Sequence, residues 1–254
     1  MTRFAPALLV VSALALTAAL PARADEFTSA QRGAVEKIIK EYLLEHPEVL
    51  QEAMAALEKK QAVAEAEKAK TAIKDHSDAI FNSPYQVTLG NLQGDVTFVE
   101  FFDYNCGYCK RAMTDMFSLM EKDPKLKVVL KEFPVLGPGS VEAARVAAAV
   151  RMQDKTGTKY REFHQKLLGG RGQADKARAM AVAKEVGLDV ARLEKDMKSE
   201  EVTTTINENM KLAEALGING TPSYVIGRGA NGDLVVGAVG LEALNKKIDA
   251  SRTQ

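Results

Sequence analysis

Residues 100–113 read EFFDYNCGYCKRAM and contain both cysteines of the chain, Cys106 and Cys109. An apolar run precedes the pair and a helical pattern follows it, so we expect Cys106 in the first turn of a helix that begins directly after a strand. The unpaired N–H groups and the dipole at a helix N-terminus stabilise an anion. The position therefore predicts a lowered pKa for the Cys106 thiol, aided by the positive charges of Lys110 and Arg111.

Cys109 follows one helical turn later, on the same side of the helix and close enough to form a disulfide with Cys106. We expect Cys106 to be the exposed sulfur that attacks a substrate, and Cys109 to be the more buried sulfur that resolves the mixed disulfide. The pair therefore predicts a redox couple.

Three other roles compete for the two thiols. A closed structural zinc site needs four nitrogen or sulfur ligands, and none of the histidines (His46, His76 and His164) has ligand spacing to the pair. Copper(I) bound by two thiolates is chemically reasonable and stays an alternative. An inert structural disulfide would close a very short loop and would restrain the unfolded chain little.

The start of the chain predicts a secretory signal peptide. Arg3 provides a positive charge, ALLVVSALALTAAL (7–20) is an apolar run too short for a membrane anchor, and Ala22 and Ala24 are the small residues of a cleavage site. We expect cleavage after Ala24 and export from the cytosol to a compartment where disulfides form and persist.

The composition excludes several classes of protein. Removing the signal peptide takes away Arg3 and Arg23 and no acidic residue, so the formal charge moves from 0 to −2. A nucleic-acid partner is therefore not expected, because binding one needs a basic patch. With two cysteines and no tryptophan, the chain must be stabilised by an ordinary apolar core rather than by many disulfides.

Residues 28–74 are rich in Ala, Glu and Lys and predict two helices separated at Pro47. Beyond Leu57 the pattern still favours a helix but has almost nothing to bury. Apolar residues recur at helical spacing before that point: Val35, Ile38, Ile39, Tyr42 and Leu43, then Leu50, Met54 and Leu57. These stripes could pack against the following domain of the same chain or against the same segment of neighbouring chains. We expect the second, with the stretch 58–74 as a spacer.

From Tyr85 onwards the pattern predicts an α/β fold with one mixed sheet. Turn residues and apolar runs predict strands at 85–89, 96–104, 126–135, 223–227 and 234–240. Helical patterns fill 108–123, most of 140–217 and 241–251. The strand at 96–104 is mostly apolar, so we expect it to be buried on both faces.

Four features follow one another along the chain: FVEFFDYNCGYC (98–109), the helical stretch 140–217, GTPSYVIG (220–227), and a final strand and helix. In this order they resemble the Dsb-type periplasmic thiol–disulfide oxidoreductases, whose thioredoxin-like fold carries an inserted helical domain. The resemblance covers roughly residues 85–250. The segment IIKEYLLEHPEVLQEAM (38–54) further resembles the N-terminus of the suppressor-of-copper-sensitivity (Scs-type) group.

The resemblance implies a proton acceptor below the cysteines. Glu100 matches the buried acid of the family, whose pKa burial would raise and which could take the proton from Cys109. From the sequence alone, Glu100 could instead reach solvent at a strand edge. Lys131, on the next expected strand, could pair with Glu100 or could face solvent.

The resemblance also implies a substrate-binding edge. Pro222 matches the cis-proline of the family, which would hold the backbone of Thr221 open to an extended substrate chain. Tyr108 is expected to be exposed beside the substrate, with Tyr104 adding apolar surroundings. Core packing is the expected role of Phe101 and Phe102. The methionines at helical spacing, Met113, Met116 and Met120, also predict core packing rather than a copper site.

The Gly107–Tyr108 dipeptide and Thr221 resemble the isomerase and reductase members of the family more than its strong oxidases. We therefore expect a disulfide isomerase or reductase that acts on unfolded or misoxidised secreted proteins. A membrane thiol reductant would keep it reduced, and it would need no cofactor beyond the Cys106–Cys109 disulfide. The alternatives are a disulfide oxidase, or a copper(I)-binding protein of copper tolerance that uses the same two cysteines.

The expected organisation is a signal peptide (1–24), a helical oligomerisation segment (25–60), a helical linker (61–80) and a Dsb-like thioredoxin domain (81–254) with its helical insert at about 140–217. By resemblance to the Scs-type proteins, the homo-oligomer would be a trimer. The apolar stripes themselves do not distinguish a dimer from a trimer.

Overall fold

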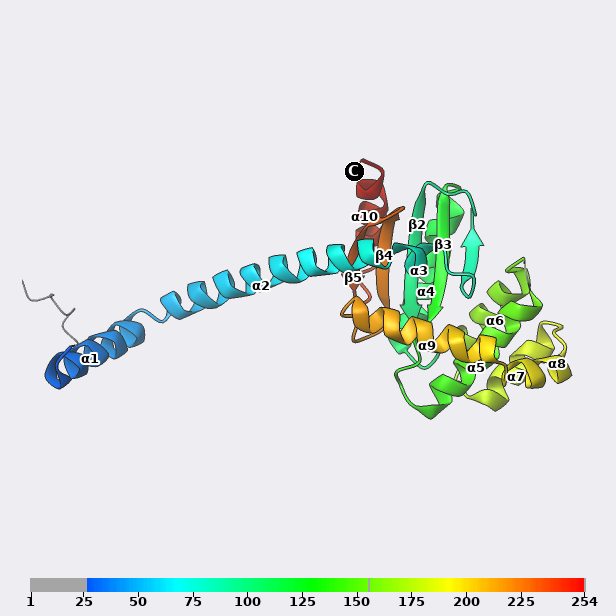
Figure 1. The fold of residues 1–254 in the computed structure, drawn as a ribbon, viewed down its shortest axis with the longest axis horizontal. Helices are drawn as coiled ribbons and strands as arrows, with labels where there is room; N and C mark the ends of the chain where they lie inside the picture. The colour runs from blue at the N-terminus through cyan, green and yellow to red at the C-terminus, as the bar shows by residue number, and fades with distance from the viewer. Residues whose placement is uncertain (1–26, 155, 254) are drawn as a thin grey trace, which may run out of the picture. The chain divides into compact units, whose positions relative to one another are not determined.

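The computed structural model describes residues 27–154 and 156–253. The expected signal peptide, residues 1–24, lies outside these ranges. The chain divides into two compact units, Met1–Glu58 and Lys59–Gln254, and Figure 1 shows the helices and strands of each.

The residues of the first unit that the structure describes are mostly helical. α1 (Ser29–Glu45) begins with a capping box, in which the Thr28 hydroxyl accepts a hydrogen bond from the Gln31 backbone N–H and the Gln31 side chain accepts one from the Thr28 N–H. The helix ends ahead of Pro47, and α2 (Glu48–Asp75) begins one residue later. The interruption at Pro47 is the expected one, because proline disfavours a helical conformation in the residue before it.

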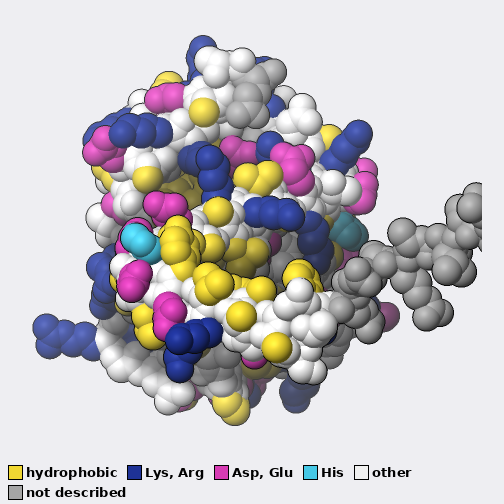
Figure 2. Space-filling view, turned by 90° about the vertical axis from the view of Figure 1, so that its left-hand side faces the viewer, with side chains coloured by type: hydrophobic (Ala, Val, Ile, Leu, Met, Phe, Trp, Pro, Cys, Tyr) yellow, Lys and Arg dark blue, Asp and Glu magenta, His cyan; other side chains and the backbone are white. Residues whose placement is uncertain are grey.

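The apolar stripes of this unit are exposed. No described residue of α1 is buried, and Leu43 is half-buried. The other seven members of the two stripes are between 41% and 64% exposed: Val35, Ile38, Ile39, Tyr42, Leu50, Met54 and Leu57. Figure 2 shows hydrophobic side chains gathered at the surface turned towards the viewer. The helical stripes are therefore present as expected, and within the described chain they remain uncovered.

The second unit contains one mixed sheet of five strands in the order β1–β3–β2–β4–β5. β2 and β3 are parallel, and the other neighbouring pairs are antiparallel. This confirms the α/β fold with one mixed sheet. The strands are β1 (Val87–Gly90), β2 (Val96–Phe102), β3 (Leu126–Glu132), β4 (Ser223–Arg228) and β5 (Asn231–Val236).

The central strand β2 is buried along its whole length, so its alternate side chains serve two different cores. One face, with Phe98 and Phe102, packs against α4 (Gly107–Lys122) and α10 (Leu241–Thr253). The other face, with Val99 and Phe101, packs against α3 (Ser77–Phe81) and the end of α9 (Glu200–Ala215). Burial on both faces explains why this strand is apolar throughout instead of alternating.

The helical insert runs between β3 and β4. It comprises α5 (Pro138–Gln153), α6 (Thr158–Gly169), α7 (Lys176–Glu185), α8 (Val190–Asp196) and α9. The buried residues of α5 are mostly alanines, which let the neighbouring helices approach closely. Figure 1 shows α6, α7 and α8 grouped to one side of the sheet.

The last hairpin differs from the expected one. β5 begins at Asn231, inside the stretch expected as a turn, because Arg228 pairs with Asn231 and leaves a two-residue turn. Gly229 adopts a φ of 56° there, a conformation that favours glycine. The strand ends at Val236 instead of continuing to residue 240, and Gly237 turns away with a φ of 88°.

Across the part of the chain that is described, no helix is both long and apolar enough to cross a membrane.

Candidate active site

The two cysteines lie where β2 gives way to α4, on the face of the sheet that α4 covers. Cys106 is the N-cap residue of α4, directly before the first turn in which we expected it. Its sulfur accepts a hydrogen bond from the backbone N–H of Cys109 at 3.4 Å. Both cysteines are free thiols in this structure.

The pKa of the Cys106 thiol is lowered to about 5. The main cause is a hydrogen bond from the Cys109 thiol, and the backbone N–H groups of Cys109 and Tyr108 contribute further. Lys110 and Arg111, which we expected to help, are not among the main causes. Lys110 Nζ donates instead to the Gly170 carbonyl at 2.9 Å, and the Arg111 guanidinium stacks on the Tyr108 ring at 4.5 Å.

Cys109 has the opposite environment. It is fully buried, whereas Cys106 is 7% exposed, so the two differ less in exposure than expected. The hydrogen bond to Cys106 and burial together raise the pKa of the Cys109 thiol far above its usual value. At neutral pH one sulfur is therefore a thiolate and the other a thiol, as the expected division of roles requires.

The loop before β4 completes the site. The Thr221–Pro222 peptide bond is cis, as the family resemblance implies. The Thr221 carbonyl oxygen lies 3.3 Å from Cys106 Sγ, which donates to it as a thiol. The Pro222 carbonyl accepts a hydrogen bond from Gly237 N–H at 2.9 Å, which ties the loop to the end of β5. The fold thus brings together residues 115 positions apart in the sequence.

Glu100 lies on β2 and faces the cysteines. It is 1% exposed, and neither carboxylate oxygen has a hydrogen-bond partner among the described residues. Burial, with the negative charge of the Cys106 sulfur as a second cause, raises the pKa of Glu100 to about 8. The alternative of a solvent-exposed Glu100 is therefore wrong.

Lys131 belongs to the opposite face of the sheet. The parallel register pairs it with Phe101, whereas Glu100 pairs with Leu130. Lys131 is 1% exposed, and its Nζ donates to the Ala79 carbonyl at 2.7 Å and to Gln86 Oε1 at 3.0 Å. Both expectations for Lys131, a pair with Glu100 and a solvent-facing position, are wrong. Its burial lowers its pKa to about 7.

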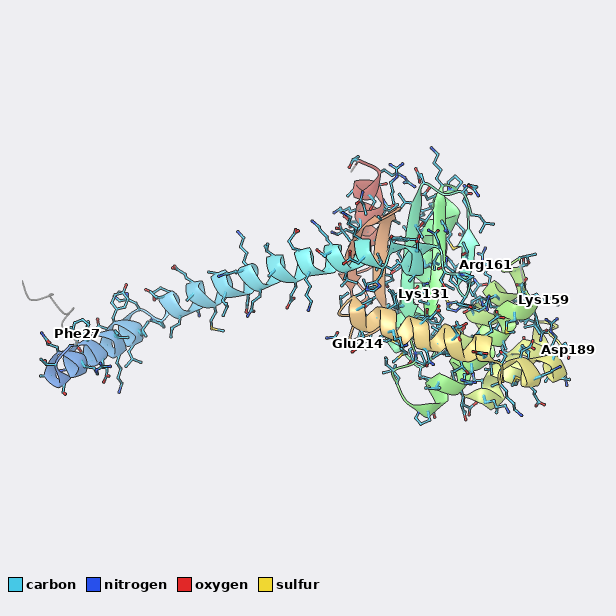
Figure 3. All side chains as sticks on the ribbon, in the orientation of Figure 1. Phe27, Lys131, Lys159, Arg161, Asp189 and Glu214 are labelled. Atoms are coloured by element: carbon cyan, nitrogen blue, oxygen red, sulfur yellow. The ribbon has the colours of Figure 1, made fainter. Side chains whose placement is uncertain are left out.

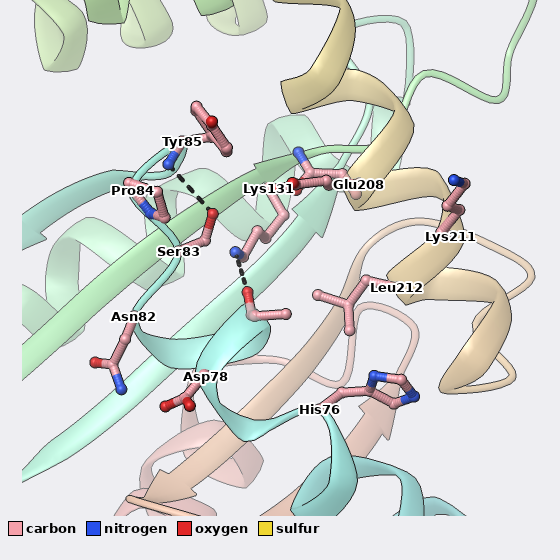
Figure 4. Close-up of a pocket in the computed structure, with 12 residues that line it drawn as sticks. His76, Asp78, Asn82, Ser83, Pro84, Tyr85, Lys131, Glu208, Lys211 and Leu212 are labelled. Carbon is pink, nitrogen blue, oxygen red and sulfur yellow. Dashed lines mark hydrogen bonds between the residues drawn. The ribbon is translucent and has the colours of Figure 1, made fainter. Parts of the chain in front are cut away.

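Lys131 also lines a cavity of about 510 Å³ between α3, the loop that follows it, and α9 (Figure 4). Figure 3 shows Lys131 beside the sheet, whereas Lys159 and Asp189 lie on the insert. Because the cavity opens on the face of the sheet opposite the cysteines, it has no part in the dithiol site.

The aromatic residues around the cysteines divide into exposed and buried ones. Tyr108 is 60% exposed beside Cys106, and Phe101 and Phe102 are fully buried, each as expected. Tyr104 is only 5% exposed, so its expected contact with substrate is wrong. Its hydroxyl lies 3.3 Å from His164 Nδ1 and 3.4 Å from the Tyr160 hydroxyl, inside the insert.

The sequence reasoning missed Asp103, which is 1% exposed directly after β2. Its carboxylate accepts hydrogen bonds from the N–H groups of Asn105, Val135 and Leu136 and from the Ser140 hydroxyl, at 2.7 to 2.9 Å. The signal was available: an acidic residue at the end of an apolar strand needs donors when it is buried.

Among the residues that the structure describes, no three His, Cys, Asp or Glu side chains are placed to hold a metal ion. His164 lies among aromatic rings, and burial lowers its pKa to about 3. Met116 is fully buried, and Met113 and Met120 pack against the same core. These methionines are core residues, as expected.

Comparison with known families and structures agrees with this geometry. Residues 97–249 match the family described as DSBA-like thioredoxin domain. Residues 31–64 match the family described as copper resistance protein ScsC N-terminal domain.

Solved structures resemble the chain over most of its length. A thioredoxin-like oxidoreductase from Silicibacter pomeroyi is 45% identical, with a TM-score of 0.65, over 70% of this chain and 98% of that one. The thiol-disulfide exchange protein alpha-DsbA2 from Wolbachia pipientis is 33% identical, with a TM-score of 0.65, over 72% and 95%. ScsC from Proteus mirabilis in a transitional conformation is 27% identical, with a TM-score of 0.64, over 89% and 97%.

Two curated relatives match different shares of their own length. The probable disulfide bond formation protein D of Bacillus cereus is 25% identical over 186 residues, which cover 69% of this chain and 83% of that protein. The Na(+)/H(+) antiporter NhaA 1 of Salinispora arenicola is 25% identical over 164 residues, and the chain spans only 24% of its length. The chain belongs to the DsbA-like thioredoxin family of thiol–disulfide oxidoreductases and carries an N-terminal segment of the ScsC type.

Proposed function

We propose that the protein is a periplasmic disulfide isomerase or reductase that acts on unfolded or misoxidised exported proteins through Cys106 and Cys109. The observation that carries the proposal is the position of Cys106 Sγ. It accepts a hydrogen bond at the N-terminus of α4 and lies 3.3 Å from the Thr221 carbonyl, beside a cis peptide bond. A substrate chain that pairs with the Thr221 backbone would present its disulfide to this sulfur.

The proposed reaction begins when the Cys106 thiolate attacks one sulfur of a substrate disulfide. An S–S bond forms between Cys106 and the substrate, the substrate disulfide breaks, and the second substrate sulfur leaves as a thiolate that takes a proton from solvent. The Cys109 thiol then loses its proton and attacks Cys106. The substrate leaves as a dithiol, and the protein carries the Cys106–Cys109 disulfide. In isomerisation, a different substrate thiolate releases Cys106 instead.

Glu100 is the proposed acceptor of the Cys109 proton. The negative charge of the Cys106 sulfur is one cause of the raised pKa of Glu100. Once Cys106 forms a disulfide with the substrate, its sulfur carries no charge. The pKa of Glu100 then falls from its raised value towards pH 7. The carboxylate then becomes available at the moment when Cys109 must be deprotonated.

The choice of isomerase over oxidase rests on the residues around the sulfurs. The dipeptide between the cysteines is Gly107–Tyr108, and Thr221 precedes the cis-proline. The segment offers no histidine between the cysteines to stabilise the reduced form further, as a strong oxidant requires. A membrane thiol reductant is the proposed partner that returns the disulfide to the dithiol, and no further cofactor is needed.

The proposed location is the periplasm, reached by a signal peptide cleaved after Ala24. A similar solved structure, 28% identical, is described as a periplasmic thioredoxin-like protein from Salmonella enterica. An oxidising compartment suits a protein whose substrates carry disulfides.

The uncovered stripes of the first unit support a homo-oligomer, with a trimer favoured by the ScsC-type segment. Leaving large apolar side chains in water forfeits about 1.5–3 kcal/mol for each one that could be buried, and seven members of the two stripes are at least 41% exposed. Several catalytic domains joined in one assembly would act on the same substrate at high effective concentration. This arrangement favours isomerisation, which needs repeated attack on one chain.

Copper(I) binding by Cys106 and Cys109 is the second candidate, because the N-terminal segment matches a family named for copper resistance. Two thiolates are suitable ligands for copper(I). One measurement distinguishes copper(I) binding from thiol–disulfide exchange as the function. Copper(I) that survives dialysis in a protein without thiol-exchange activity would select the copper function.

The division of roles between the sulfurs predicts which variant accumulates mixed disulfides. Cys109→Ser cannot resolve the complex and should trap substrate proteins covalently, whereas Cys106→Ser should trap none. Non-reducing gels with mass spectrometry of the trapped species measure both. Trapping by Cys106→Ser alone would reverse the assignment.

The proposed role of Glu100 predicts a defect confined to the second step. Glu100→Gln should slow the resolution of a preformed mixed disulfide at Cys106 about 100-fold, the scale of a lost general base, and leave the first attack unchanged. Rapid-quench kinetics with a disulfide peptide separate the steps. Glu132→Gln, which changes another buried acid (5% exposed) on the adjacent strand, is the control. Normal resolution in Glu100→Gln would exclude the role.

The oligomer proposal predicts that activity and assembly fail together. Deletion of residues 25–60 should give a monomer that still reduces a peptide disulfide but recovers little activity from a scrambled multi-disulfide protein. Ile38→Glu should also weaken assembly and isomerisation, because Ile38 lies in the apolar stripe. Lys37→Glu should change neither, because Lys37 lies outside the stripe. Light scattering gives the mass. A monomeric mature wild type at micromolar concentration would contradict the proposal.

A further inference from the structure

The three residues immediately before Cys106 all bind the helical insert. Asp103 contacts α5 and the loop before it, and Tyr104 contacts α6. Asn105 contacts α5 and the connection between α6 and α7. The segment that carries the attacking sulfur is therefore attached on one side to the insert and on the other to α4.

Asn105 is attached to the insert by three side-chain hydrogen bonds. Its Oδ1 accepts from Ala174 N–H at 2.7 Å, while its Nδ2 donates to the Ala174 carbonyl and to Ser140 Oγ, both at 2.9 Å. A backbone N–H can only donate and a carbonyl can only accept, so these partners fix the orientation of the amide. The side chain satisfies both polar groups of one backbone residue 69 positions away.

Ser140 joins this amide to Asp103. Its hydroxyl accepts from Asn105 Nδ2 and donates to Asp103 Oδ1 at 2.7 Å. The Asp103 carboxylate also accepts from Asn105 N–H at 2.8 Å. Asp103, Asn105, Ser140 and the Ala174 backbone thus form one connected network, called here the insert clamp. Ser140, Ala174 and Asp103 are each 1% exposed, so water competes little for these bonds.

The insert clamp acts on Cys106 through the backbone. Cys106 N–H donates to the Asp103 carbonyl at 3.0 Å, and Asn105 is its covalent neighbour. The sulfur has two polar contacts with opposite effects on its charge. Cys109 N–H donates to it at 3.4 Å and favours the thiolate, whereas the Thr221 carbonyl, at 3.3 Å, accepts from the thiol form. A shift of the 103–105 segment would move the sulfur relative to Cys109 N–H and weaken this hydrogen bond, because a hydrogen bond depends on both distance and angle. The thiolate of Cys106 would then be less stable.

We propose that Asn105 is a positioning residue for the nucleophile. Through Ser140 and Ala174 it holds the segment before Cys106 against the helical insert, and so keeps the sulfur between the α4 N-terminus and the Thr221 carbonyl. The insert would then take part in the chemistry of Cys106 through the backbone of the segment that precedes it. The inference rests on the thiol chemistry of the family and is independent of the choice between isomerase and oxidase.

A residue that only stabilised the fold would alter the unfolding midpoint and leave the sulfur unchanged. The decisive readout is therefore the pH profile of Cys106 alkylation by iodoacetamide in the full-length, reduced protein, with the modified residue located by mass spectrometry. The assay needs no substrate protein, so it gives an answer even if the isomerase proposal fails.

Wild-type alkylation should be half-maximal near pH 5, since the pKa of the Cys106 thiol is lowered to about that value. In Asn105→Ala the midpoint should rise by about 1 unit, so that the rate below pH 5 falls about tenfold. Ser140→Ala removes one of the three side-chain bonds of Asn105, so it should shift the midpoint in the same direction by less. The double variant should shift it no further than Asn105→Ala, because both changes break one network.

Asn245→Ala is the matched control, because this asparagine lies exposed on α10 and its side chain donates to the neighbouring Asp249; its profile should equal that of the wild type. Urea unfolding of each variant reports stability separately. If Asn105→Ala and Ser140→Ala unfold at lower urea but keep the wild-type pH profile, the insert clamp is structural only. An unchanged profile in Ser140→Ala combined with a shift in Asn105→Ala would remove Ser140 from the proposal.

Discussion

The site depends on the contact between the Cys106 sulfur and the N-terminus of α4. The sulfur occupies the N-cap position, where other helices place a serine or aspartate oxygen. Like those oxygens, it accepts a hydrogen bond from a backbone N–H of the first turn, here that of Cys109. The N-terminus of α4 therefore stabilises the thiolate form of Cys106. The apolar strand β2, buried on both faces, leads directly into the segment that carries Cys106. On the other side of the sulfur lies the carbonyl of Thr221.

The sheet separates two ionisable side chains, Glu100 and Lys131, that lie on neighbouring strands. They are buried on opposite faces. Glu100 faces α4 and the cysteines, where it has no hydrogen-bond partner among the described residues. Lys131 faces α3, where the Ala79 carbonyl and Gln86 satisfy it. An ion pair between them would have lowered the pKa of Glu100. Without that pair, burial raises the pKa instead, which makes the carboxylate suitable for exchanging protons near neutrality.

The fold and the two sulfurs could be predicted from the sequence because their signals are local. Apolar runs, turn residues and helical spacing indicated the mixed sheet, the helical insert and the strand-to-helix junction at Cys106. What the sequence did not reveal depends on register and on distant contacts. The face to which Lys131 points follows from its pairing with Phe101. The partners of Asn105 lie 35 and 69 residues away, and no local pattern indicates them.

The most direct test of this account is the reduction potential of the Cys106–Cys109 couple, measured by equilibration with glutathione. A stabilised Cys106 thiolate favours the dithiol, so the potential should lie near that of protein disulfide isomerase, about −180 mV. A potential at or below that of thioredoxin, about −270 mV, would mean that the α4 N-terminus does not stabilise the sulfur, and would contradict the account.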